Sequence, residues 1–172
     1  LKFLKYAPAA ESAESLHVSQ TFYRTGTAPD STFEPLPATL QMPGLEPIDL
    51  SGPLPLAPAA LFHQGEPVFL RLVDPDQNLD PAVPETVLVT LTLELTGDTE
   101  VLRLSETGPD TGIFTGYIQS GNGDGTPYNG IMSVREEGIL AASYVDPGDG
   151  SDTAAALREM VDSYFLDYNV DE

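Results

Sequence analysis

The stretch from residue 85 to residue 119 constrains the fold more than any other part of the chain. Apolar residues occupy alternate positions at its start, and turn residues at 96–99 and 108–112 then separate two further apolar runs. The alternating residues are Val87, Val89, Leu91, Leu93 and Leu95. A period of two is typical of a strand with one buried face, and short breaks between such runs are typical of hairpins. The stretch therefore predicts three antiparallel strands in sequence.

More strands are expected on both sides of this meander. The segments 65–73, 131–134 and 138–145 have strand-like apolar patterns and are bounded by turn residues. Together with shorter runs they bring the expected total to about seven strands, at the spacing of a sandwich. The predicted fold class is all-β, an immunoglobulin-like antiparallel β-sandwich with its core in residues 65–152.

The two ends of the chain are expected to lie outside this core. Residues 1–64 are rich in proline, which removes a ladder donor and fixes φ, so we expect an extended arm with short edge strands rather than a central sheet. A flexible linker is the alternative for this segment. For the tail, 153–172, we expect a short helical or irregular piece over 154–161, which has helical propensity, and then a last strand over 163–168.

The charge balance excludes several classes of partner. The chain carries 7 Lys+Arg and 27 Asp+Glu, a net charge of −20. Nucleic acids and anionic membranes repel such a surface, and cations or basic partners suit it. No apolar run reaches the roughly 18 residues of a membrane span, so no membrane insertion is expected. No signal-peptide pattern opens the sequence, and its start on Leu1 favours a mature product or a piece of a longer chain.

The strongest candidate for a binding site is the loop 74–85. Oxygen-bearing side chains stand at positions 1, 3, 5, 7 and 12 of this segment, the spacing of a calcium loop. They are Asp74, Asp76, Asn78, Asp80 and Glu85. Leu79 occupies the position where an EF-hand needs glycine, and the flanks are strands, so the prediction is a strand–loop–strand calcium site. The alternative is a solvated turn whose side chains cap their own backbone.

A second acidic loop gives a weaker candidate for the same ion. Asp146, Asp149 and Asp152 follow the strand 138–145 at a spacing of three residues, which fits no motif. In a sandwich the two loops can lie at the same end and share an ion. Asn122 and Asp124 either join them or only form a turn.

Nothing in the sequence indicates a catalytic site. The chain has no cysteine, which excludes disulfides, thiolate metal sites and a cysteine nucleophile. Its 2 histidines, His17 and His63, lie far apart and are expected to be packing or surface residues rather than zinc ligands. With 27 acids, chance carboxylate pairs are certain, so no pair identifies a glycosidase. We therefore predict that the protein is not an enzyme.

Two segments carry a resemblance to a known family. They read VDPDQNLDPAVPETVLVTLTLELTGDTEVLRLSETGPDTGIFTGYIQ and GILAASYVDP. This region, roughly 66–152, resembles the immunoglobulin-like modules of very large bacterial surface and secreted proteins of the adhesin type. The resemblance implies an extracellular or cell-surface structural role. Some such modules contain a Lys–Asn isopeptide bond; here the only lysines, Lys2 and Lys5, lie outside the matched region, so none is expected in the sandwich.

Three functions stay open at this point. The first is a stalk or spacer module, whose partners are other modules or copies of the same protein. The second is a self-assembling fibre subunit, a homopolymer in which a terminal strand such as 1–7 completes the sheet of the next copy. The third is a glycan- or protein-binding module that uses loop residues such as Tyr128 and Asn129.

Overall fold

The structure, a computed structural model, describes residues 1–28, 30–42, 46–93, 96–121, 125–134, 138–146 and 149–161, the last of these by backbone alone. The described chain is built of β-strands, with one 3-10 turn, η1 (Pro75–Gln77). The strands are β1 (Lys2–Tyr6), β2 (Glu14–Leu16), β3 (Phe22–Arg24), β4 (Phe33–Pro35), β5 (Thr39–Leu40), β6 (Ile48–Asp49), β7 (Leu54–Pro58), β8 (Leu61–His63), β9 (Pro67–Val73), β10 (Thr86–Leu93), β11 (Asp98–Glu106), β12 (Ile113–Gly121), β13 (Ile131–Ser133), β14 (Gly138–Asp146) and β15 (Asp149–Val161). The all-β class is confirmed.

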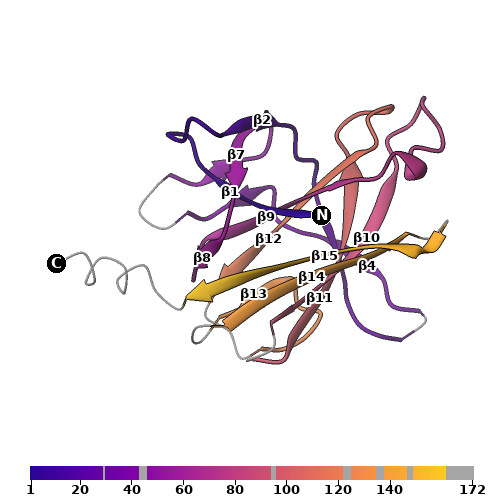
Figure 1. The fold of residues 1–172 in the computed structure, drawn as a ribbon. Coiled ribbons are helices and arrows are strands. Elements are labelled where there is room, and N and C mark those ends of the chain that lie inside the picture. The colour runs from indigo at the N-terminus through magenta and orange to yellow at the C-terminus, as the bar shows by residue number, and fades with distance from the viewer. Residues whose placement is uncertain are drawn as a thin grey trace.

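The strands form two layers of a sandwich (Figure 1). One layer has the order β2-β7-β1-β9-β12, and the other has the order β11-β10-β14-β15-β8. The hairpin between β11 and β12 connects the layers, because these strands pair only close to their turn. Within the layers β9 pairs antiparallel with β12 and β10 pairs antiparallel with β14, whereas β15 pairs parallel with β8.

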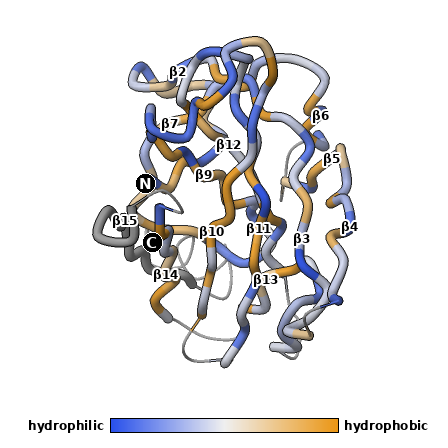
Figure 2. Tube along the Cα trace, turned by 90° about the vertical axis from the view of Figure 1, so that its right-hand side faces the viewer, coloured by the Kyte–Doolittle hydropathy of each residue, from blue (hydrophilic) through white to orange (hydrophobic). Residues whose placement is uncertain are grey.

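The central meander has the predicted form. Strand β10 buries Val87, Val89, Leu91 and Leu93 and exposes most of the residues between them. It pairs with β11 over its whole length. The four apolar side chains of its inner face all belong to the hydrophobic core. Figure 2 shows the hydrophobic residues concentrated on the central strands. Burying such a side chain stabilises the fold by about 1.5–3 kcal/mol, which is why the period of two decides the register.

The expectation of a helical piece at 154–161 is wrong. These residues belong to β15, which pairs antiparallel with β14 from Gly138 to Val145. Helix propensity is a weak local preference, and the open edge of β14 offers a complete ladder of hydrogen-bond partners, which outweighs it. The strand expected over 163–168 lies outside the described residues.

The expectation that the strands of residues 1–64 lie only at sheet edges is wrong for β1. Strand β1 lies between β7 and β9 and pairs antiparallel with both. Phe3 and Leu4 are buried, and the ring of Phe3 contacts the ring of Phe62 edge-on at 6.0 Å between centroids. Residues of 1–64 and of 65–152 share one hydrophobic cluster, so the structure does not set the N-terminal segment apart as an arm.

Prolines do not keep the N-terminal segment out of the sheet. Strand β7 contains Pro55 and Pro58, yet it lies inside the sheet, between β2 and β1. Proline lacks an N–H but keeps its carbonyl, and the carbonyl of Pro55 accepts from the Ala7 N–H at 2.9 Å.

The chain runs through the sandwich from one end to the other. Lys2 pairs with Arg71, next to the end of β9, whereas Val161 pairs with His63, just before β9 begins. Strand β1 therefore begins toward the end of β9, whereas β15 ends close to the start of β9. In the part of the chain that the structure describes, no helix is long and apolar enough to cross a membrane.

Candidate functional site

Acidic side chains gather at the end of the sandwich where β9 and β14 finish. Three connections meet there: the loop 74–85, the turn 107–112, and the bulge that follows Val145. We call this end the acidic pole. Asp74 and Asp76 of the first acidic loop and Asp146 of the second lie together at this end.

Asp74 fixes the start of the first loop. Its carboxylate caps η1 by accepting from the Asp76 N–H at 3.1 Å, and Pro75 supplies the φ that the first position of the turn needs. The same side chain is only 5% exposed, and its other oxygen accepts from the Tyr144 hydroxyl at 2.7 Å. The carboxylate is thus held between the loop that it begins and strand β14.

Asp146 brings the second loop to the first. It ends β14, is buried, and accepts from the Gln77 side chain at 2.7 Å. One carboxylate oxygen from each of Asp74, Asp76 and Asp146 lies within 4.8 Å of the other two. Asp76 is exposed, so the group opens to solvent on one side. Three carboxylates at this separation repel one another, and a divalent cation with oxygen ligands would offset that repulsion.

The other predicted ligands of the first loop take different roles. Asn78 donates to Asp110 at 2.6 Å, across to the turn 107–112. Asp80 accepts from the Ala82 N–H at 2.9 Å. Glu85 closes the loop on itself, because its two oxygens accept from the backbone N–H groups of residues 79 and 80 at 2.6 and 3.0 Å. The structure thus gathers two of the five residues of the calcium spacing and adds Asp146.

The remaining candidates of the second loop are not placed by side chain. Asp149 and Asp152 are the first and fourth residues of β15, for which only the backbone is described. Asn122 and Asp124 lie outside the described residues.

A fully buried glutamate stabilises the acidic pole from inside the sandwich. Glu106, at the end of β11, accepts from the Gly112 N–H at 2.9 Å and from the Glu85 N–H at 2.8 Å. It ties the turn 107–112 to the loop 74–85. Gly112 has φ +65°, and a Cβ there would lie 3.0 Å from the Cα of Pro75, so only glycine lets these two connections pack.

Two more buried carboxylates hold the opposite end of β11. Glu100 accepts from the N–H groups of Asn129 and Gly130 at 2.9 and 3.1 Å, and Asp98 accepts from the Ser133 N–H at 2.7 Å. Burial raises the pKa of Glu100 to about 7; the amide donors lower it and the nearby Asp98 raises it. Tyr128 and Asn129, the residues considered for ligand binding, therefore lie in a loop that β11 holds in place.

The two histidines lie in unrelated surroundings. His63 is buried beside Glu66, with 3.5 Å between Nδ1 and the nearer carboxylate oxygen, and Lys5 approaches the other oxygen of Glu66 at 3.6 Å. His17 is exposed and contacts the Ser19 hydroxyl at 3.3 Å. Among the described residues, neither histidine joins the acidic group at the pole.

The buried acids of β11 are the functional feature that sequence reasoning missed. Asp98, Glu100 and Glu106 lie on the same inward face as Leu102 and Leu104. The signal was present, because these acids keep the same period of two as the leucines between them. An acid in phase with a buried apolar run indicates a carboxylate that accepts hydrogen bonds from a neighbouring turn.

Comparisons with protein-family models and with curated proteins do not assign a function to this site. No protein-family model matches the chain, and no curated protein matches it in sequence.

Proposed function

We propose that the protein is a non-enzymatic structural module of an extracellular or bacterial cell-surface protein, a spacer in a stalk of the adhesin type. The observation that carries this proposal is the position of the first and last described strands. Lys2 pairs with Arg71, three residues before Asp74, and Val161 pairs with His63, just before β9 begins, so most of the length of β9, about 13 Å, separates the start of β1 from the end of β15. A module that takes in the chain at one end and passes it on at the other adds length to a stalk.

The position of β1 favours a spacer over a fibre subunit. A subunit that grows by strand complementation presents a terminal strand to the next copy and leaves a gap in its own sheet. Here the N-terminal strand fills the place between β7 and β9 of its own chain. A terminal strand that is already paired on both sides has no free edge to offer.

We further propose that calcium binds at the acidic pole through Asp74, Asp76 and Asp146. Carboxylate oxygens are the ligands that calcium prefers, and the 6–8 oxygens of its shell would be completed by backbone carbonyls and water. The ion would connect the loop 74–85 to the end of β14 and so stiffen the pole. Carboxylates on two separate elements, within 4.8 Å of one another, are what supports this assignment.

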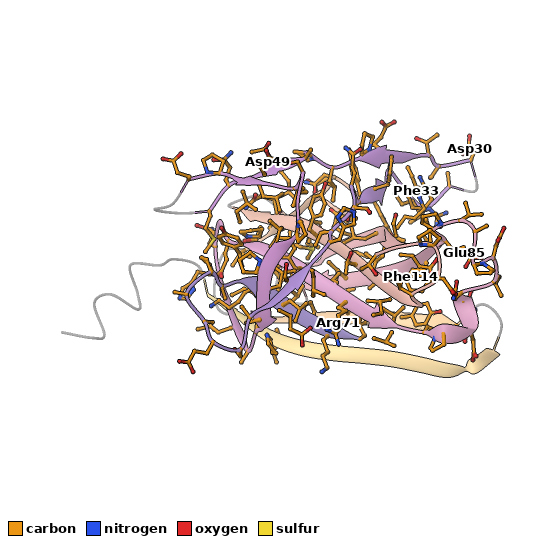
Figure 3. The ribbon with its side chains drawn as sticks, turned by 90° about the horizontal axis from the view of Figure 1, so that it is seen from above. Asp30, Phe33, Asp49, Arg71, Glu85 and Phe114 are labelled. Carbon is orange, nitrogen blue, oxygen red and sulfur yellow. The ribbon has the colours of Figure 1, made fainter. Side chains whose placement is uncertain are left out.

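Calcium titration monitored by thermal unfolding tests the metal proposal. A ligand that binds only the folded state stabilises it by about 2.7 kcal/mol at a hundredfold excess over Kd, so Tm should rise with calcium and fall with chelator. Asp76→Ala should abolish the rise. Asp49→Ala, which removes an exposed acid at the other end of the molecule from Glu85 (Figure 3), should leave it intact. An equal response of both variants would mean that calcium acts only through the net charge.

Electron microscopy of the purified protein tests the spacer proposal. Dispersed small particles, with and without chelator, are the expected result. Filaments with a regular repeat would overturn the spacer in favour of the fibre subunit, and glycan binding by the isolated domain would favour the binding module.

A further inference from the structure

The outer side of the hairpin β3–β4 and of the neighbouring strand β11 carries two arginines. Strands β3 and β4 extend the second layer beyond β11 (Figure 2). Arg103 of β11 pairs with Phe22 of β3, and Arg24, two residues further along β3, pairs with Phe33 of β4. Residues that pair across strands, and residues two apart on one strand, share a face of the sheet. We call these four residues the arginine patch.

The guanidinium of Arg103 is held in place by two aromatic rings. Its Cζ lies over the ring of Phe22 at 4.7 Å from the centroid and over the ring of Phe33 at 4.8 Å. Such contacts attract the cation and restrict the side chain, while the N–H donors along the edge of the guanidinium stay available. Among the described residues, none accepts a hydrogen bond from Arg103 or pairs with its charge. The group is therefore a positioned fork of donors.

Arg24 also lacks an acidic partner in the part of the chain that the structure describes. Its guanidinium makes one long hydrogen bond, to the carbonyl of Ala28 at 3.4 Å. The two acids of the hairpin, Asp30 and Glu34, form no ion pair with it. Glu34 pairs with Tyr23 and so lies on the other face of the sheet. The chain has 27 Asp+Glu and 7 Lys+Arg, yet two neighbouring arginines have no described carboxylate against them.

We propose that the arginine patch binds an acidic peptide segment of another protein, in an extended conformation with carboxylates at alternate positions. The planar fork of Arg103 matches a carboxylate, which accepts two parallel hydrogen bonds from it. Diagonal neighbours on paired strands, such as Arg24 and Arg103, start about 7–8 Å apart. Alternate residues of an extended peptide lie about 6.7 Å apart and point to the same side, so two carboxylates can reach both arginines.

The surroundings of the patch suit a contact of this kind. Leu88 pairs with Arg103 across β10 and β11 and is 48% exposed, so apolar surface borders the guanidinium on its other side. A peptide that covers this surface excludes water from the charged pairs and strengthens them. The net charge of −20 opposes an acidic peptide at long range, but charges more than about 8 Å apart are largely screened at physiological ionic strength. The proposal does not depend on calcium or on the spacer function.

Isothermal titration calorimetry at physiological ionic strength, with matched peptides, tests the proposal. The probe is a short threonine-rich peptide with two glutamates at alternate positions. It should bind, and the same peptide with glutamines in their place should not. A peptide of the same composition with its two glutamates adjacent should bind more weakly, because adjacent side chains of an extended chain point to opposite sides. Polygalacturonate serves as the acidic polysaccharide for comparison.

Matched variants locate the contact on the protein. Arg103→Lys keeps the charge but loses the planar fork, and it should weaken peptide binding by roughly tenfold. Arg24→Lys should weaken it as well and provides a second variant. Arg71→Lys makes the same change on the first layer, where Arg71 already pairs with Glu14 at 2.8 Å, and should leave binding unchanged. Urea unfolding would confirm that each variant is folded.

Four results would each overturn the proposal. They are no binding of the alternating peptide, equal binding of the glutamine peptide, equal weakening by Arg71→Lys and Arg103→Lys, and binding of polygalacturonate without binding of any peptide. The last result would assign the patch to an acidic polysaccharide instead.

Discussion

Replacing the buried glutamate that braces the acidic pole should destabilise the protein strongly. Glu106→Ala removes two hydrogen bonds to a charged acceptor, from the N–H groups of Gly112 and Glu85. Leaving such a donor unpaired in the interior costs about 1–3 kcal/mol, and charge-assisted bonds lie in the upper part of that range. Glu85 is only partly buried, so water can replace one bond in part. We therefore expect a loss of about 3–5 kcal/mol in the free energy of unfolding.

An exposed glutamate with an equally short contact provides the control. Glu14 meets Arg71 at 2.8 Å, but its side chain is 63% exposed, and such surface pairs contribute about 0–1 kcal/mol. Equilibrium urea unfolding of the wild type, Glu106→Ala and Glu14→Ala gives the comparison from the transition midpoints at unchanged m-value. A difference below about 1 kcal/mol between the two variants would refute the argument that the buried hydrogen bonds hold the pole together.

Two further predictions concern other fixed points of the structure. The pKa of Glu100 is raised to about 7 in the folded state, so the folded protein holds this proton more tightly than the unfolded chain does. The contribution of Glu100 to the free energy of unfolding is therefore largest below its ordinary pKa near 4.5. It falls as the pH rises from there to about 7. Urea unfolding at a series of pH values should show this fall in the wild type and lack it in Glu100→Gln; parallel profiles for the two proteins would contradict the assignment. Gly112→Ala should destabilise the protein more than Gly97→Ala. Both glycines have positive φ, but only a Cβ at position 112 would meet Pro75. Equal decreases in Tm for the two variants would rule out that close approach.

Local patterns in the sequence were sufficient for the strands whose partners are close in the chain. The alternation of β10 and the Gly-containing turn before β11 predict both the buried face and the pairing, because neighbouring strands joined by a short turn have little choice of partner. The sequence also predicted a strand at β14, but not which of its faces is buried. Leu140, Ala142 and Tyr144 lie inside, and Ile139 and Val145 lie outside.

The features that the sequence did not predict depend on contacts between distant segments. The place of β1 between β7 and β9 is decided by the edges of strands that lie fifty or more positions away in the chain. Likewise, Asp146 joins Asp74 and Asp76 because β14 and β9 end at the same pole, which loop spacing does not encode. In the candidate metal site, Asp80 and Glu85 fit the spacing of ligands but serve as caps of their own loop.

The positions of the two chain ends also have a mechanical consequence. A pull on Lys2 and Val161 acts along the strands, because β1 starts beside Arg71, toward the end of β9, and β15 finishes beside His63, just before β9 begins. Strand β1 would then be loaded in shear against β7 and β9, with all its ladder hydrogen bonds sharing the force at once. Peeling from one end would break them singly and at lower force. The geometry that places β1 inside the sheet therefore also makes the fold resistant to stretching along its long axis.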